Sequence, residues 1–328
     1  MTILNESITS YVITNDELVC IHKIKNETQK NNVDNILRTK AYLDFFLQYP
    51  EIKWTFLASM VSRNGGWNMC DLEGKWFPLV LPEKLRNLLF LTYERANWLI
   101  FNDAYPQMLL YHYSTKMGRP MFHLLPFFYV SSFMEDEWKH YWRQRDGKRL
   151  ITSLIINEQN VIQTPVIEHP VFSKKVFHSF SYYFQEWFHF SSVLFPTLEG
   201  EVFGSAVSGF TKLDNRIDLG KKLADILFLP ELYPLFLKFS LEQEHTGSRH
   251  DYEKYFRMKK EKTTPNLRDV FPVITHHIHN HNDWSKQRKI KKSWFKHNRN
   301  KSSIVLTDWY EEKQNQMHSL IKVGDQLL

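Results

Sequence analysis

Apolar residues recur three or four positions apart along most of the chain, and this spacing predicts α-helices. The third such run is predicted to end at Asn64-Gly65-Gly66, because these residue types tolerate the left-handed conformation that follows many helices. The predicted helices cover residues 15–29, 35–48, 51–62, 83–101, 104–116, 132–145, 148–162, 172–190, 214–228 and 231–244.

Three stretches interrupt this helical pattern. Residues 76–82 are predicted to be extended or irregular, and residues 194–210, with one proline and three glycines, to form the longest loop. Beyond about Lys259 the periodicity is lost. We therefore expect a mainly α fold, in which residues 11–258 form a multi-helix globular domain. A basic, His-rich C-terminal extension follows at residues 259–328, and it is predicted to be partly helical or disordered.

Composition favours a helical interior built from large side chains. Of the 328 residues 43% are apolar and 15% aromatic, and only 11 are glycine. Cys20 and Cys70 are the only cysteines, so neither a disulfide scaffold nor a zinc site is expected. The chain begins without a signal-peptide pattern and contains no run of about 18 uncharged apolar residues. The sequence thus predicts a soluble, cytoplasmic protein without a transmembrane segment.

Several polar residues fall where the pattern predicts a buried position. Glu94 and Asn97 lie on a helix that is apolar nearly all round, and Glu158 falls on an apolar helical face. A buried carboxylate is costly unless it is paired with a cation or protonated. One interpretation is a general acid or base with amides that orient a substrate, and the other is a structural salt-bridge network. The candidate residues are Arg63, Asn64, Glu94, Arg95, Asn97, Asp103 and Glu158, of which Asp103 is also predicted to cap a helix.

A second candidate site is the string Glu244-His245-Thr246-Gly247-Ser248-Arg249-His250-Asp251. Free N–H groups at a helix start, together with Arg249, would suit an anion, and His245 would supply an acid or base. Ser248 and Asp251 also have the spacing of a capping box, which needs no ligand.

The basic extension offers a third possibility. Residues 285–301 contain eight Lys or Arg and no acid, with aromatic residues between them. Such a stretch suits phosphates and stacked bases or an anionic membrane surface, and it also suits a solvated tail. The candidate nucleic-acid contacts are Arg288, Lys289, Lys291, Lys292, Trp294 and Lys296. His277, His279 and His281 would share one side of an extended chain, but the neighbouring lysines oppose cation binding, so no metal site is predicted.

Three strings resemble a known family: VSRNGGWNMCDL at residues 61–72, ERANWLIFNDAYPQ at 94–107 and HTGSRHDYE at 245–253. They are similar to an uncharacterised family of Bacillus-type bacteria, the YppC-like proteins, up to about Phe256. The resemblance implies a bacterial cytosolic protein and assigns no catalytic residue, cofactor or partner.

No catalytic or cofactor motif, such as a phosphate-binding GxxxxGKS loop, occurs in the sequence. The sequence therefore favours a binding or interaction protein with a polar internal site. The alternatives are a hydrolase for a phosphate-bearing or sugar substrate, which would use Glu94 or Glu158 with Arg63 and His245, and a nucleic-acid-associated protein. An enzyme would require Arg63, Glu94 and Arg249 to converge on one pocket.

Overall fold

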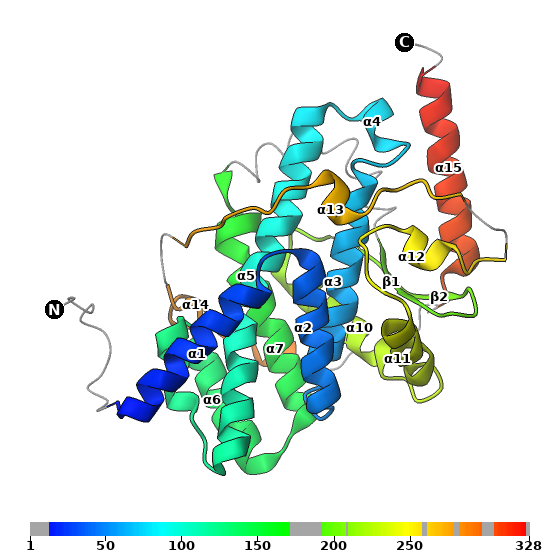
Figure 1. Cartoon of the computed structure of the whole chain (residues 1–328). Coiled ribbons are helices and arrows are strands. Elements are labelled where there is room, and N and C mark those ends of the chain that lie inside the picture. The colour runs from blue at the N-terminus through cyan, green and yellow to red at the C-terminus, as the bar shows by residue number, and fades with distance from the viewer. Residues whose placement is uncertain are drawn as a thin grey trace.

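A computed structural model describes residues 13–170, 192–207, 209–257, 261–278, 282–296 and 305–325, and it confirms a mainly α fold (Figure 1). The first half of the chain forms α1 (Asn15–Asn31), α2 (Asn35–Gln48), α3 (Trp54–Asp71), α4 (Phe77–Val80), α5 (Glu83–Met117), η1 (Phe122–Phe128), α6 (Ser132–Gln144) and α7 (Gly147–Val161). It is followed by η2 (Gln163–Ile167), β1 (Ser192–Pro196), β2 (Val202–Ala206), α10 (Leu213–Leu227), α11 (Tyr233–Glu242), α12 (His250–Glu253), α13 (Leu267–Val270), α14 (Trp284–Gln287), η4 (Lys292–Phe295) and α15 (Thr307–Asp325).

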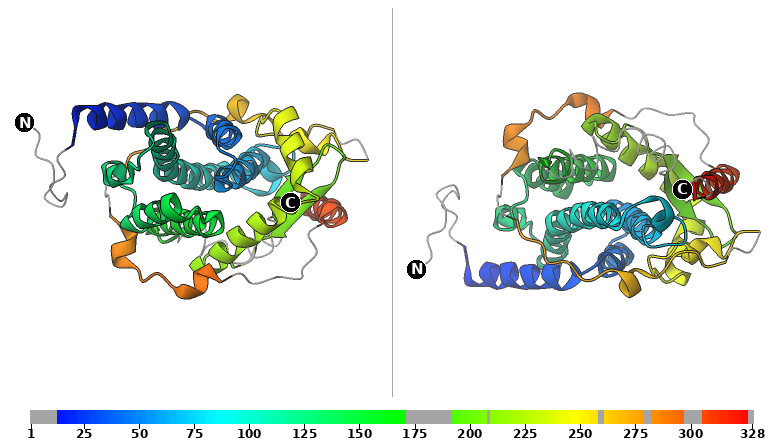
Figure 2. Two further views of the ribbon diagram at one scale, coloured as in Figure 1. Left: turned by 90° about the horizontal axis from the view of Figure 1, so that it is seen from below. Right: turned by 90° about the horizontal axis from the view of Figure 1, so that it is seen from above.

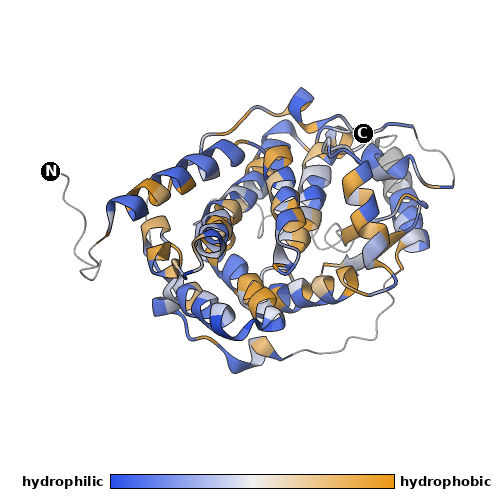
Figure 3. Ribbon diagram, turned by 60° about the horizontal axis from the view of Figure 1, so that its bottom comes forward, coloured by the Kyte–Doolittle hydropathy of each residue, from blue (hydrophilic) through white to orange (hydrophobic). Residues whose placement is uncertain are grey.

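The helices α3 and α5 form the centre of the molecule. Helix α3 packs against α2, α5, α7, α10 and β1, and α5 packs against α1, α2, α3 and α7. Viewed along the helices, α1 lies on the outside of this group, and the coloured ribbon places hydrophobic residues towards the middle (Figures 2 and 3). The core is rich in rings, among them Trp54, Trp67 and Trp138, each at most 1% exposed. Burial of these apolar faces is the main force that holds the helices together.

The predicted end of the third helix at Asn64-Gly65-Gly66 is wrong. Helix α3 continues through both glycines to Asp71. A Cβ atom at Gly65 would lie 2.9 Å from Asn97 Nδ2, and one at Gly66 would lie 2.5 Å from Asn35 Oδ1. The glycines are thus required by close side-chain contacts in mid-helix, where they do not act as a C-cap.

Helix α5 also runs further than predicted. It is continuous over 35 residues, from Glu83 to Met117, so Asp103 does not cap a second helix. The Asp103 carboxylate instead points into the protein, where it accepts hydrogen bonds from Gln107 Nε2 and Asn157 Nδ2. The position of the Asp103 carboxylate is therefore explained by its hydrogen bonds to Gln107 and Asn157, and not by a helix start.

Residues 194–210 do not form the long loop that was expected. Strands β1 and β2 make an antiparallel hairpin in which Phe195 lies opposite Phe203. The backbone of Gly204 has φ 143°, a conformation that favours glycine, and a side chain there would collide with the Val193 carbonyl. Of the three glycines that suggested a loop, Gly204 thus lies within β2, Gly200 lies in the turn between the strands, and Gly209 follows the hairpin. Residues 76–82, expected to be irregular, contain the single-turn helix α4.

Beyond residue 259 the described segments pack against the helical body. Leu306 pairs with Val202 of the hairpin through an N–H···O bond of 2.9 Å, and α15 lies beside the hairpin (Figure 2). Trp294 and Tyr310 are buried in the same core as the helices. The division at residue 258 stays a prediction. The predicted aromatic helix at 172–190 lies outside the described residues. None of the helices within the described part is long and apolar enough to cross a membrane.

Candidate functional site

Arg63 acts as a cap for another helix. Its Nη1 donates to Gln243 O and its Nη2 to Ser240 O, both at 2.9 Å, at the C-terminal end of α11. Burial lowers the pKa of Arg63 to about 10, so the guanidinium remains charged at neutral pH. A cation at a helix C-terminus interacts favourably with the helix dipole and with the unpaired carbonyls.

Asn64 joins α3 to the hairpin. Its Nδ2 donates to Leu194 O and its Oδ1 accepts from Leu194 N, both at 2.8 Å. The side-chain amide thus pairs with the backbone of β1 as a neighbouring strand would. All of these atoms are buried, which makes the pairing structurally important.

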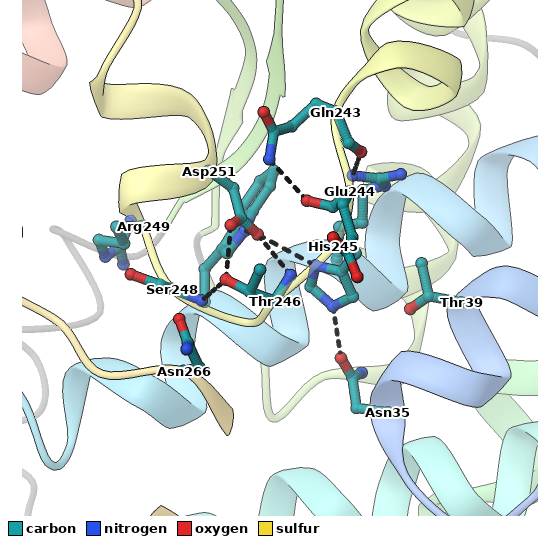
Figure 4. Close-up of polar contacts among 12 residues, drawn as sticks. Asn35, Thr39, Gln243, Glu244, His245, Thr246, Ser248, Arg249, Asp251 and Asn266 are labelled. Atoms are coloured by element: carbon teal, nitrogen blue, oxygen red, sulfur yellow. Dashed lines mark hydrogen bonds and ion pairs between the residues drawn. The ribbon is translucent and has the colours of Figure 1, made fainter. Parts of the chain in front are cut away.

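His245 lies in a chain of buried hydrogen bonds (Figure 4). Its Nε2 is 2.8 Å from Asn35 Oδ1, and its Nδ1 is 3.4 Å from Asp251 Oδ2. Asn35 Nδ2 in turn donates to Ser62 O. The Asn35 Oδ1 must therefore accept, which places the His245 proton on Nε2.

This environment does not suit His245 to proton transfer with a substrate. The residue is 5% exposed, and both ring nitrogens face protein oxygens. Burial lowers the pKa of His245, and the nearby Asp251 carboxylate opposes that effect. Asp251 itself accepts from Trp67 Nε1 and from the backbone N–H of Thr246. The chain binds α2, α3 and the 245–251 segment together.

The capping box predicted from Ser248 and Asp251 is wrong. The Ser248 hydroxyl donates to Thr264 O, and the Asp251 carboxylate is held by Thr246, so neither caps α12 by the predicted exchange. Arg249 forms a partly buried ion pair with Asp71, whose side chain is 12% exposed, and also donates to Asn68 Oδ1. The Arg249 guanidinium and the backbone N–H groups of Arg249 and His250, which were proposed to bind an anion, thus donate to other groups of the protein.

Glu94 is paired with Arg38, a cation that the sequence did not suggest. Their side chains are 5% and 1% exposed. The second carboxylate oxygen, Oε1, makes no hydrogen bond with any described residue and lies 3.8 Å from His276 Nε2. Arg95 donates from Nη2 to the His277 carbonyl at 2.9 Å. Glu94 and Arg95 therefore meet the segment around His276 and have no contact with Arg63.

Glu158 and Asp103 are held elsewhere. Glu158 Oε2 accepts from Trp54 Nε1 at 3.0 Å, and Glu158 Oε1 accepts from Gln159. Burial raises the pKa of Glu158 to about 7 and that of Asp103 to about 7. Asn97 donates only to Tyr93 O within its own helix. The candidate residues thus belong to several separate contacts, and Arg63, Glu94 and Arg249 do not line one pocket among the described residues.

A groove of about 530 Å³ lies between α1 and α5 and includes His276, the residue that faces Glu94. The extended residues 273–278, which we call the strap, form a further wall and cross α5 in Figure 1. Both polar and apolar residues line it, as in many ligand sites. The other walls are formed by Lys25, Thr28, Gln29, Asn32 and Val33 near the end of α1, by Trp98, Asn102 and Pro106 of α5, and by Phe127, Phe128 and Tyr129 at η1.

Two buried polar atoms of the groove walls lack a hydrogen-bond partner within the described structure. They are Oγ1 of Thr28, a residue 5% exposed, and Nε2 of His276, whose side chain is 7% exposed. The His276 ring lies 5.2 Å from the ring of Trp98. Sequence reasoning missed Thr28, Arg38 and Trp98, because nothing in a linear pattern shows which helices face one another. His276 directly precedes the alternating histidines that begin at His277, and no role was assigned to it from the sequence.

The basic extension is largely engaged with the body of the protein. Arg288 pairs with Glu168, and Lys291 pairs with Asp214. Trp294 is 4% exposed and donates from Nε1 to Asp214 Oδ1. The carbonyl of Lys296 accepts from Lys221 Nζ. Lys289 and Lys292 are exposed and form no ion pair with a described residue.

A relative and a family model match most of the chain. The chain is 48% identical to the "Uncharacterized protein YppC" of Bacillus subtilis (strain 168) over 304 residues, which cover 92% of this chain and 94% of that protein. No solved structure matches the chain. A family model described as "Protein of unknown function (DUF2515)" matches residues 30–311. The chain therefore belongs to the DUF2515 family, and its resemblance to YppC-like proteins is confirmed.

Proposed function

We propose that the protein is a binding protein whose ligand occupies the groove between α1, α5, η1 and the strap. The observation that carries the proposal is a pair of buried polar atoms on its walls, Thr28 Oγ1 and His276 Nε2, that make no hydrogen bond with a described residue. His276 Nε2 has a long ion-pair contact, 3.8 Å, with Glu94 Oε1. A buried polar group without a partner costs about 1–3 kcal/mol, so natural proteins keep few of them. A ligand with hydrogen-bonding groups would satisfy both.

The walls also define the character of the ligand. Trp98, Phe127 and Phe128 offer rings to an apolar body. The groups on the described walls that can carry a positive charge are Lys25, His276 and His277, and no wall residue is Asp or Glu. Glu94 is not among the wall residues; its Oε2 pairs with Arg38 and its Oε1 lies 3.8 Å from His276 Nε2. An apolar body with an anionic head therefore complements the groove.

Binding is favoured over hydrolysis because the proposed catalytic groups have partners inside the protein. Arg63 caps α11, His245 is held between Asn35 and Asp251, and Glu158 accepts from Trp54. The nucleic-acid alternative has less support, since the ring of Trp294 is buried and cannot stack on a base. Cys20 and Cys70 are buried free thiols, which fits the predicted cytoplasmic location.

Anilinonaphthalene sulfonate, an aromatic dye with a sulfonate group, is a suitable probe for this groove. We expect saturable binding with an increase in dye fluorescence. In Trp98→Ala the affinity should fall by about fivefold or more, because the ring that packs on the apolar body is lost. The matched control is Leu241→Ala, which removes an exposed apolar side chain from α11 and should leave the affinity unchanged. Absence of saturable binding, or equal affinities for all three proteins, would overturn the proposal.

A further inference from the structure

The strap has the alternation of a β-strand although it belongs to no sheet within the described structure. Ile274, His276 and Ile278 are half-buried against the helices, and Val273, Thr275 and His277 between them are exposed. Ile274 packs beside the cluster that contains Leu267, and Ile278 beside the one that contains Leu99. A period of two is the signature of an extended strand with one face on the core.

The backbone of this strand is almost unused. From Val273 to Ile278 no N–H group donates to a described residue, and the one carbonyl engaged is that of His277, which accepts from Arg95 Nη2. Six consecutive residues thus present strand-forming groups beside a groove. Such an edge is a template for a further strand, and proteins usually cover or blunt it. The strap carries neither a lysine nor a glutamate to do so.

We propose that the ligand of the groove is an acidic peptide segment, bound as an added strand along the strap. This inference rests on the proposed function, because it names the ligand class of the same groove. Backbone hydrogen bonds to the strap would supply affinity, and alternate side chains of the peptide would enter the groove. At about 3.3 Å per residue, the six residues of the strap match a partner segment of about six residues.

Charge and shape select the composition of the segment. Lys25 and His277 lie on the walls and no described wall residue is acidic, so carboxylates on the peptide would be attracted and lysines repelled. His276 already faces the Glu94 carboxylate at 3.8 Å and is not counted among these charges. The rings of Trp98, Phe127 and Phe128 provide a site for one aromatic or large aliphatic side chain. Thr28 Oγ1 is placed to pair with a polar group on that peptide.

The first test uses a labelled peptide Glu-Asp-Phe-Asp-Leu-Glu and its charge-reversed control Lys-Lys-Phe-Lys-Leu-Lys. Fluorescence anisotropy should show binding of the acidic peptide only, and the acidic peptide should displace anilinonaphthalene sulfonate from the groove. If the dye binds through Trp98 and the acidic peptide neither binds nor displaces it, the peptide inference is overturned and the proposed function stands. If neither probe binds, both are overturned.

The second test distinguishes strand pairing from contact through side chains alone. Alternate N–H groups of a strand point to opposite edges, so only every second peptide amide can reach the strap. Two versions of the acidic peptide, N-methylated on alternate amides, should therefore differ by about tenfold or more in affinity. Amide hydrogen exchange at residues 273–278 should slow when the unmodified peptide is bound. Equal affinities of the two methylated peptides, or unchanged exchange in the strap, would contradict the inference.

Discussion

Gly66 is the residue whose side chain would do the most damage to the buried hydrogen-bond chain. A Cβ atom there would lie 2.5 Å from Asn35 Oδ1 and 2.7 Å from His245 Nε2, two atoms that bond to each other. We expect Gly66→Ala to destabilise the protein by about 2 kcal/mol, since overpacking and the loss of that bond outweigh the gain in helix propensity. Urea unfolding would measure the change.

Gly147→Ala is the matched control for Gly66→Ala. Gly147 is the first residue of α7, and its added Cβ would meet only the Glu51 carbonyl, at 3.9 Å. This substitution should be neutral or stabilise by up to about 1 kcal/mol. Similar losses for both variants would mean that the effect comes from helix conformation and not from contact with Asn35 and His245.

Asp103 should make the stability of the protein depend on pH. Burial raises its pKa to about 7 from an ordinary value near 4, so between these pH values the folded state binds more protons than the unfolded state. Its contribution to the free energy of unfolding therefore falls as pH rises from about 4 to about 7. We expect the free energy of unfolding of Asp103→Asn, relative to that of the wild type, to increase by about 2 kcal/mol between pH 4.5 and pH 8. Full burial would give a larger increase, but Asp103 is only half-buried.

The pH effect is measured by urea unfolding of both proteins across this range. Glu158, whose pKa burial also raises to about 7, remains in both and cancels from the difference. The Asp103→Asn variant keeps an oxygen that can accept from Gln107 and Asn157. Parallel pH profiles would show that Asp103 titrates as it does in the unfolded chain.

At the scale of elements, Asn64 shows how one side chain positions a hairpin. Its amide makes the two hydrogen bonds that join α3 to the backbone of Leu194. Asn64→Ala leaves two buried backbone groups unpaired and should cost about 2–3 kcal/mol. Amide hydrogen exchange should accelerate in β1 and β2 and stay unchanged in α1. This difference would show that the loss of stability originates at the hairpin.

Asn97→Ala controls for the loss of an asparagine from a helix. The Asn97 side chain bonds only to Tyr93 O in its own helix, so its removal should cost less than about 1 kcal/mol and leave exchange in the hairpin unchanged. An equal effect of both substitutions on the hairpin would contradict the assigned role of Asn64.

The sequence predicted the helices more accurately than the segments that connect them. Apolar spacing located α2 at 35–48 as it is found, because that helix buries one face. The pattern failed where tertiary contact overrides local preference: Gly65 and Gly66 suggested a helix end but make room for Asn97 and His245. The hairpin was missed because its glycines are typical of loops. The burial of Glu94 was predicted correctly, but its partner Arg38 lies 56 positions away, and spacing alone does not reveal such pairs.

For the whole molecule, the question is whether the chain beyond residue 259 is an appendage or part of the core. Trp294 is 4% exposed, its Nε1 donates to Asp214 at 2.7 Å, and its carbonyl accepts from Lys221 Nζ. Arg288 and Lys291 add ion pairs with Glu168 and Asp214, although exposed pairs contribute little. Trp294 thus joins this segment to α10 through both its buried ring and its backbone carbonyl.

Trp294→Ala should therefore destabilise the entire protein by about 3–5 kcal/mol, the usual cost of removing a buried tryptophan. Urea unfolding followed by circular dichroism at a helical wavelength should show one transition at a lower urea concentration. Trp294→Phe keeps most of the ring, loses only the bond to Asp214 and should cost about 1 kcal/mol. If Trp294→Ala left the main transition unchanged, residues 259–328 would be an independent extension, as the sequence predicted. A shift of the whole transition would show that the segment with the strap unfolds together with the helices beneath it. The groove would then be a preformed feature of the folded protein.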